Sequence, residues 1–173
     1  MHGLSLFFSE TIHPFEDGNG RIGRAISEKA LSQGLGRPAL LSMSEAIEAN
    51  RSDYYAALKV AQRSNEITDW IAWFTSTLIL AQEQAEKKVD FTLEKARLFD
   101  RVRENVNDRQ LKVLRRMAAA GPRGFEGGMS AKKYQSMTGA SKATATRDLR
   151  DLVFKNTLKS IGGGRSIRYH LDL

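Results

Sequence analysis

Apolar residues recur at helical spacing along most of the chain and predict a mainly α-helical protein. Leu4, Phe7, Phe8 and Ile12 mark the end of a helix over residues 4–12, which Pro14 stops. A second helix is expected from near Gly20 to Gln33, with Asn19 as its cap. The same spacing predicts further helices over 44–63, opened by Ser44, over 70–88, and over 93–107.

The pattern changes at residue 108. Three short helices are expected over 109–120, 131–137 and 141–154, with Ser130 and Ser141 as caps of the last two. Residues 157–161 and 166–171 then alternate on either side of a triple glycine, as the strands of a β-hairpin do. Helices followed by a hairpin in this order resemble a winged helix–turn–helix. We therefore expect two domains, over residues 1–107 and 108–173.

Charge is divided at the same point. Residues 1–107 hold 13 Lys and Arg against 15 Asp and Glu, whereas residues 108–173 hold 14 against 5. A near-neutral part joined to a basic one indicates two modules, the second of which meets an anion such as DNA. A basic surface that is only solvated is the alternative.

The composition excludes some classes of protein. A hydrophobic content of 41% supports a packed core, and the absence of cysteine excludes disulfides and thiolate metal sites. No apolar stretch approaches the ~18 residues that span a bilayer, and the start of the chain lacks the basic region of a signal peptide. We expect a cytoplasmic protein without a membrane partner.

The segment from His13 to Arg24 combines groups that handle phosphate. Gly18 and Gly20 let the backbone approach a ligand at the start of a helix, where unpaired N–H groups attract anions. Arg21 and Arg24 lie three residues apart and so emerge on one helical face. Asp17 is an oxygen ligand suited to Mg²⁺, and His13 can take a proton near neutral pH. These residues predict transfer of a phosphate-linked group.

The segment His-Pro-Phe-Glu-Asp-Gly-Asn-Gly-Arg-Ile-Gly-Arg also resembles the active-site motif of the Fic (filamentation) family at every defined position. The resemblance, extended to about residue 107, implies the C-terminal part of a Fic-type helical bundle that transfers AMP from Mg-ATP to a Ser, Thr or Tyr hydroxyl of a target protein. It implies His13 as the base, Asp17 as the Mg²⁺ ligand and Phe15 as a buried anchor of the loop. For the phosphates it implies Gly18, Asn19 and Gly20 as the anion hole, with Arg21 and Arg24 on the outer phosphates.

A second resemblance lies in Arg51-Ser52-Asp53-Tyr54-Tyr55. In the family, paired tyrosines of this segment line the nucleotide pocket, which implies that role for Tyr54 and Tyr55. Adjacent residues on a helix point about 100° apart, so one of the two is the candidate for plain core. The family has Asn seven residues after the second tyrosine, and this chain has Gln62 there.

Other readings remain open. Only twelve residues precede His13, whereas family members carry further helices and a target-docking flap, so we expect a fragment of the family fold. The alternatives to AMP transfer are a DNA- or protein-binding regulator with a non-functional Fic remnant, AMP removal, and transfer of another phosphate group. Members of the family are often homodimers, so the resemblance implies a homodimer as one possible state of this protein.

The basic region has its own candidate contacts. The segment from Ser141 to Leu149 resembles the recognition-helix start of bacterial winged-helix regulators, and small hydroxyl residues there allow close approach to a DNA groove. Lys142 and Arg147 reach phosphates or base edges, and Arg165 lies in the wing. The expected contacts to DNA are Ser141, Lys142, Thr144, Thr146, Arg147 and Arg165. Protein binding or dimerisation through this domain is the alternative.

Overall fold

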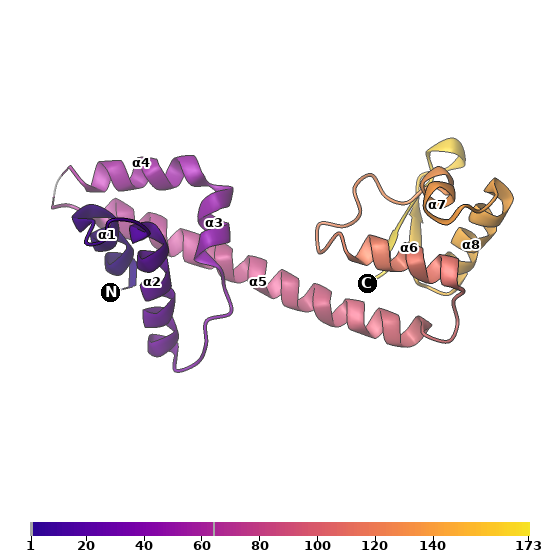
Figure 1. The fold of residues 1–173 in the computed structure, drawn as a ribbon, viewed down its shortest axis with the longest axis horizontal. Coiled ribbons are helices and arrows are strands. Elements are labelled where there is room, and N and C mark those ends of the chain that lie inside the picture. Colours follow the sequence, from indigo (N-terminus) through magenta and orange to yellow (C-terminus); the bar gives the residue numbers. More distant parts are fainter. Residues whose placement is uncertain (1, 64) are drawn as a thin grey trace. The chain divides into compact units, whose positions relative to one another are not determined.

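Helices dominate the computed structural model of the protein, which describes residues 2–63 and 65–173, without the side chains of His2 and Arg165 (Figure 1). The elements are α1 (His2–Ile12), α2 (Asn19–Leu35), α3 (Met43–Ala49), α4 (Arg51–Ala61), α5 (Thr68–Val102), α6 (Asp108–Ala118), α7 (Ala131–Thr138), α8 (Lys142–Phe154), β1 (Leu158–Ile161), a 3₁₀ turn η1 (Gly164–Ser166) and β2 (Arg168–Leu171). This confirms the predicted mainly α fold with a small hairpin. Among the described residues, no helix is long and apolar enough to cross a membrane.

The chain forms two compact units, unit 1 (Met1–Glu86) and unit 2 (Lys87–Leu173). Each has its own buried apolar cluster. The predicted boundary between 107 and 108 stays a prediction, but the cluster of unit 2 includes Leu98 and Val102 from α5, ahead of that boundary.

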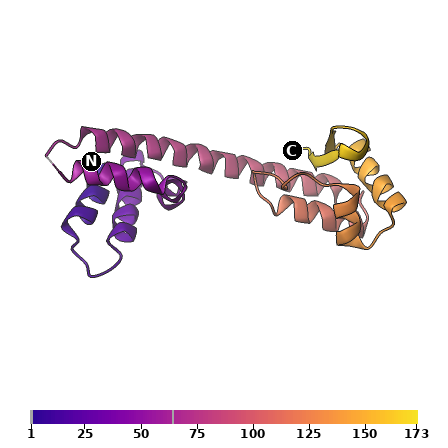
Figure 2. The same ribbon diagram turned by 90° about the horizontal axis from the view of Figure 1, so that it is seen from above.

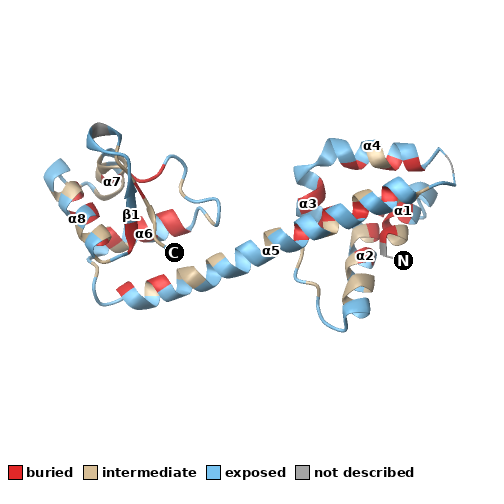
Figure 3. Ribbon diagram, turned by 180° about the vertical axis from the view of Figure 1, so that it is seen from behind, coloured by how far each residue is buried: buried red, intermediate tan, exposed pale blue. Residues whose placement is uncertain are grey.

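Two of the predicted helix boundaries are wrong. Residues 44–63 form α3 and α4 with a break at Asn50, whose φ of −132° and ψ of 44° lie outside the helical region. Conversely, the helices expected over 70–88 and 93–107 are one helix, α5, without a break (Figure 2). Figure 3 shows the reason for the misreading: from 82 to 97 every α5 residue is exposed or half-buried, so the apolar spacing fades although the helix continues.

In unit 1, the close packing of α1 on α2 positions the loop between them. Gly23 of α2 lies against Leu6 and Ser9 of α1, where a Cβ atom would stand 2.9 Å from the Cβ of Ser9. The Ser9 hydroxyl donates a hydrogen bond to the Asn19 carbonyl, at 2.8 Å. The end of α1 and the start of α2 are therefore held together, and the segment 13–18 must turn sharply between them.

Helices α4 and α5 complete the core of unit 1. Trp70 is fully buried and its indole N–H donates to the Gly3 carbonyl at 2.9 Å, which ties α5 to the start of α1. Tyr54 of α4 packs against Trp70 and Trp73, with ring centroids 6.1 and 5.5 Å apart. This aromatic cluster fixes α4 against α5.

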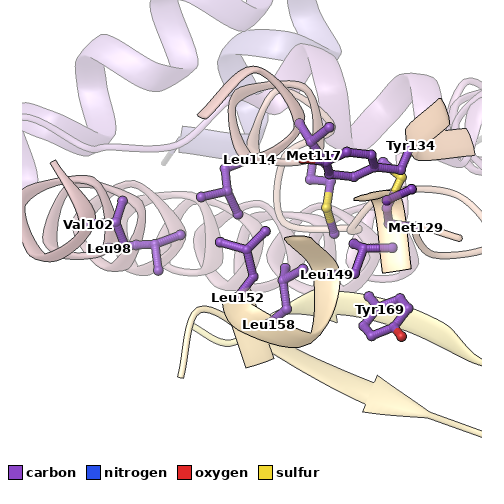
Figure 4. Close-up of a cluster of buried hydrophobic side chains, with 12 residues drawn as sticks. Leu98, Val102, Leu114, Met117, Met129, Tyr134, Leu149, Leu152, Leu158 and Tyr169 are labelled. Carbon is purple, nitrogen blue, oxygen red and sulfur yellow. The ribbon is translucent and has the colours of Figure 1, made fainter. Parts of the chain in front are cut away.

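Unit 2 contains three short helices and an antiparallel hairpin, in the predicted order. Leu158 pairs with Leu171 at one end of the hairpin and Ile161 with Arg168 at the other, and Met129 forms a bridge to Tyr169. Side chains from α5, α6, α7, α8 and both strands meet in one core (Figure 4). Ser130 and Ser141 cap α7 and α8 as predicted.

A buried polar network fixes α8 in that core. The Asp148 carboxylate, 5% exposed, accepts hydrogen bonds from Arg109 Nε of α6 at 3.0 Å and from the Tyr134 hydroxyl of α7 at 2.8 Å. Burial, with Asp148 as its acceptor, raises the pKa of Tyr134. Because both partners are on other helices, Asp148 sets which face of α8 is turned inward and which is left to solvent.

Candidate functional site

His13 follows directly after α1 in an unusual backbone conformation. Its φ of 53° is in the left-handed region, which histidine adopts more readily than bulky apolar residues do. The ring Nδ1 lies 3.1 Å from the Glu10 carbonyl oxygen, which can only accept, so a neutral ring carries its proton on Nδ1. The lone pair is then on Nε2, and the exposed ring offers it to solvent.

The N-terminus of α2 faces the same loop. Gly18 is the cap residue, with φ 84°, a conformation that favours glycine. The helical ladder begins with Ile22 N–H donating to the Gly18 carbonyl at 2.9 Å, so the N–H groups of Asn19, Gly20 and Arg21 precede the first bond of the ladder. Such groups, together with the helix dipole, bind anions.

Asn19 is buried and holds the loop rather than capping the helix. Its Oδ1 accepts from the Phe15 N–H at 3.0 Å, and its Nδ2 donates to the Phe15 carbonyl at 2.7 Å. The predicted cap at Asn19 is therefore wrong, because both ends of the amide are used across the turn. The predicted burial of Phe15 is wrong as well: its side chain is 50% exposed, and the amide of Asn19 provides the anchor instead.

Asp17 and Arg21 pair with each other at the open side of the loop. Arg21 Nη2 lies 2.7 Å from Asp17 Oδ2, and the two side chains are 72% and 89% exposed. An ion pair this exposed is weak, worth at most about 1 kcal/mol. Both side chains are therefore available to a ligand that offers each a better partner.

Arg24 lies deeper, among residues of four helices. Its Nε donates to Ser44 Oγ of α3 at 3.0 Å. Its Nη1 approaches Gly20, where it would stand 3.2 Å from an added Cβ, and such a Cβ would collide with the Glu10 carboxylate of α1. The Tyr54 hydroxyl of α4 donates to Glu10 Oε1 at 2.8 Å. The space beside the Gly20 backbone, which the sequence predicts to be open to a ligand, is thus shared with the Glu10 carboxylate.

The two tyrosines separate as helical geometry requires. Tyr54 is 2% exposed, and its burial and its bond to Glu10 raise its pKa, so its hydroxyl stays protonated. Tyr55 is 52% exposed, and the Arg51 guanidinium lies 5.8 Å from the centre of its ring. Of this pair, only Tyr55 offers an aromatic face to solvent. Gln62, at the end of α4, donates to the Thr11 hydroxyl at 3.3 Å, beside His13.

Sequence reasoning missed Glu10 and Ser44. Each contacts the site from a helix outside the twelve-residue segment, through partners 44 and 20 positions away along the chain. No local spacing marks such contacts. The nearest signal was Ser44 itself, predicted to open a helix, whereas Ser42 is the cap of α3 and accepts from the Glu45 N–H.

In unit 2 the predicted DNA contacts fall at the start and along the exposed face of α8. Ser141 is the cap, its hydroxyl accepts from the Thr144 N–H, and the Thr146 hydroxyl donates to the Lys142 carbonyl. The exposed face carries a shallow hollow lined by Lys142, Ala143, Thr146, Arg147, Arg150, Asp151 and Phe154. The side chain of Arg165 lies outside the described residues. Arg150 and Phe154, the latter 86% exposed, were not predicted.

These observations bring an exposed histidine, with Nδ1 at the Glu10 carbonyl, into the loop before a helix that carries two arginines. Residues 3–31, which contain this site, match the model of the Fic/DOC family. The match shows that this part of the chain is similar to the Fic/DOC family.

A solved structure also resembles the chain, a crystal structure of a Fic family protein from Desulfovibrio desulfuricans G20. The identity is 21% and the TM-score 0.47, over 98% of this chain and 48% of that protein. The chain thus spans about half the length of that protein.

Proposed function

We propose that unit 1 is the site of AMP transfer from Mg-ATP to a hydroxyl side chain of a target protein. The observation that carries this proposal is the His13 ring, whose Nδ1 is held by the Glu10 carbonyl so that Nε2 is free to act as the base. The ring stands at the open end of the loop that leads to the anion-binding start of α2.

The reaction follows from these positions. His13 Nε2 takes the proton of the target hydroxyl as its oxygen forms a bond to the α-phosphorus of ATP. The bond from that phosphorus to the bridging oxygen breaks, and pyrophosphate leaves with the electron pair. The N–H groups of Asn19, Gly20 and Arg21 stabilise the negative charge on the phosphates, and Arg21 and Arg24 bind the outer ones.

The Asp17 carboxylate is available for the magnesium ion of Mg-ATP. The described residues contain no group of three or more His, Asp or Glu side chains arranged to hold a metal by themselves. Mg²⁺ commonly binds through one or two carboxylates together with phosphate oxygens and water, and the exposed Asp17 fits that requirement. Bound there, the ion would neutralise phosphate charge, while Arg21 would exchange Asp17 for a phosphate.

Labelled ATP tests the proposal. With Mg²⁺, cell lysate and ATP labelled on the α-phosphate, the wild-type chain is expected to label protein, and His13→Ala to reduce this at least a hundredfold because the base is lost. His170→Ala, which removes a histidine of unit 2, is the matched control and should label as the wild type does. Equal labelling by His13→Ala would refute the role of base.

The same assay separates AMP transfer from its alternatives. Label from the γ-phosphate instead of the α-phosphate would indicate phosphate transfer. Release of AMP from protein that already carries it, without incorporation, would indicate AMP removal. No labelling and no release by any variant would favour a Fic remnant without activity in this chain.

A second candidate function, DNA binding, is favoured by the exposed face of α8. Lys142, Arg147 and Arg150 lie on this face, while Asp148 is turned into the core. The residues of unit 2 from 108 onward carry 14 basic and 5 acidic side chains. A helix that presents three cationic side chains, buries Asp148 and pairs Asp151 with Lys155 suits contact with DNA phosphates. A winged helix–turn–helix that binds protein is the competing interpretation.

Salt-dependent binding to duplex DNA tests this function. Arg147→Ala is expected to weaken binding about three- to tenfold and to lower the slope of log affinity against log salt by about one, because one phosphate contact is lost. Lys59→Ala removes the same charge from an exposed position of unit 1 and should leave the slope unchanged. No binding at low salt, or equal effects of both variants, would exclude α8 as a DNA-binding surface.

A further inference from the structure

Arg24 is held through the Nε of its guanidinium group, which donates to the Ser44 hydroxyl at 3.0 Å. Its Nη1 lies near Gly20, 3.2 Å from the place that a Cβ atom of that residue would take. Gly20 belongs to the first turn of α2, at the anion-binding end, whereas Ser44 belongs to the first turn of α3. The guanidinium therefore spans from α3 to the start of α2.

A guanidinium that is bound through Nε presents its other edge, with Nη1 and Nη2, to a ligand. That edge carries two parallel donors, which is the arrangement that binds two oxygens of one phosphate. An arginine that is already held in its binding orientation loses less conformational freedom when the ligand arrives. The hydroxyl that accepts from Nε also keeps its own proton as a donor.

We propose that Ser44 is a positioning residue for nucleotide binding: it fixes Arg24 through Nε so that the Nη1–Nη2 edge meets the outer phosphates of ATP. This inference rests on the proposed function, in which Arg24 binds those phosphates. It adds a residue of α3 to a site otherwise built from the loop and α2.

The chain offers a matched control two residues away. Ser42 is the cap of α3 and accepts from the Glu45 N–H at 3.3 Å, so its hydroxyl stabilises the helix. Ser44 instead directs its hydroxyl to Arg24. Loss of Ser42 weakens α3 as an element, and loss of Ser44 removes the contact to Arg24.

The test is the affinity for Mg²⁺ with α,β-methylene-ATP, whose α–β bridge is not cleaved, measured by titration calorimetry on the full chain. Ser44→Ala is expected to raise the Kd about three- to tenfold, and Ser44→Thr, which keeps the hydroxyl, to restore it to within about twofold of the wild type. Ser42→Ala should lower the melting temperature, because the cap of α3 is lost, and should leave the Kd close to that of the wild type. In an Arg24→Ala background, Ser44→Ala should have no further effect.

The outcomes separate this inference from the proposed function. If Arg24→Ala binds the nucleotide as tightly as the wild type, both fail. If Arg24→Ala weakens binding but Ser44→Ala does not, only the role of Ser44 is overturned. The role of Ser44 is also overturned if Ser44→Ala weakens binding equally in the wild-type and Arg24→Ala backgrounds. It is overturned as well if the Ser44→Thr variant has the melting temperature of the wild type but does not restore the affinity.

Discussion

At the scale of single residues, Asp17 and Arg21 are an exposed pair whose side chains suit ligands of opposite charge. The carboxylate suits a cation and the guanidinium a phosphate, and in the protein as described they neutralise each other at 2.7 Å. Mg-ATP supplies a better partner to both, whereas ATP without the metal supplies one only to Arg21. If unit 1 binds Mg-ATP as proposed, the pair favours the metal-bound nucleotide over the free one.

Asp17→Asn should abolish this preference. Without Mg²⁺ we expect ATP to bind about two- to fivefold more tightly, since an exposed ion pair worth up to ~1 kcal/mol no longer holds Arg21 and a repelling charge is gone. The gain in affinity on adding Mg²⁺ should disappear. Titration calorimetry with and without the metal measures both effects. Glu16→Gln neutralises the neighbouring exposed carboxylate and should change neither; an Asp17→Asn variant that still gains affinity with Mg²⁺ would exclude Asp17 as the ligand.

The residues of the site differ in how far sequence alone could find them. His13, Asp17, Gly18 and the two arginines are close in the chain, and their chemistry is visible from their types and spacing. The role of the Asn19 amide depends on a turn that returns it to Phe15, and no pattern of residue types specifies that turn. The Glu10 carboxylate and the Ser44 hydroxyl join the site only through packing of α1 and α3 against α2.

At the scale of elements, local signals predicted the starts of α7 and α8 but not the continuity of α5. Ser130 and Ser141 cap because a hydroxyl can satisfy an N–H two or three residues on, which is a local property. The continuity of α5 is different. Residues 68–102 contain neither glycine nor proline, but the polar stretch within them lacks an apolar face. In this segment, the absence of helix-breaking residues indicated a continuous helix, whereas the apolar periodicity did not.

The orientation of α8 depends on Asp148, and this predicts a large loss of stability in unit 2. Asp148→Ala leaves the buried Tyr134 hydroxyl and Arg109 without their acceptor, so we expect the free energy of unfolding to fall by roughly 3 kcal/mol. Asp172→Ala, which removes an exposed carboxylate 3.8 Å from Lys159, should cost less than about 1 kcal/mol.

Denaturant titration can assign this loss to unit 2. The two tryptophans, Trp70 and Trp73, both lie in unit 1, so fluorescence follows unit 1 while circular dichroism follows the helices of both. Asp148→Ala should shift the dichroism transition and leave the fluorescence transition in place. A variant as stable as the wild type in both signals would show that the network does not hold α8.

At the scale of the whole molecule, the change in charge and pattern near residue 108 predicted a second module, and it could not show where the core of unit 2 begins. Leu98 and Val102 lie in a helix whose polar flanks resemble a connector, yet both are buried, 1% and 2% exposed, against the side chains of α6, α8 and the hairpin. A charge boundary marks the start of a surface property. A folding boundary is set by the contacts of the core.

Two fragments distinguish these boundaries. A fragment of residues 93–173 keeps Leu98 and Val102 and should unfold cooperatively, because it contains the whole apolar cluster of unit 2. A fragment of residues 108–173 lacks both side chains, and fully burying each contributes about 1.5–3 kcal/mol, so it should be less stable by roughly 3–6 kcal/mol or fail to fold. Thermal unfolding followed by circular dichroism measures the difference.

In the longer fragment, Leu98→Ala should move stability toward that of the shorter one, whereas Leu93→Ala, at a position 51% exposed, should not. Equal stability of the two fragments would place the folding boundary at residue 108, where the charge changes.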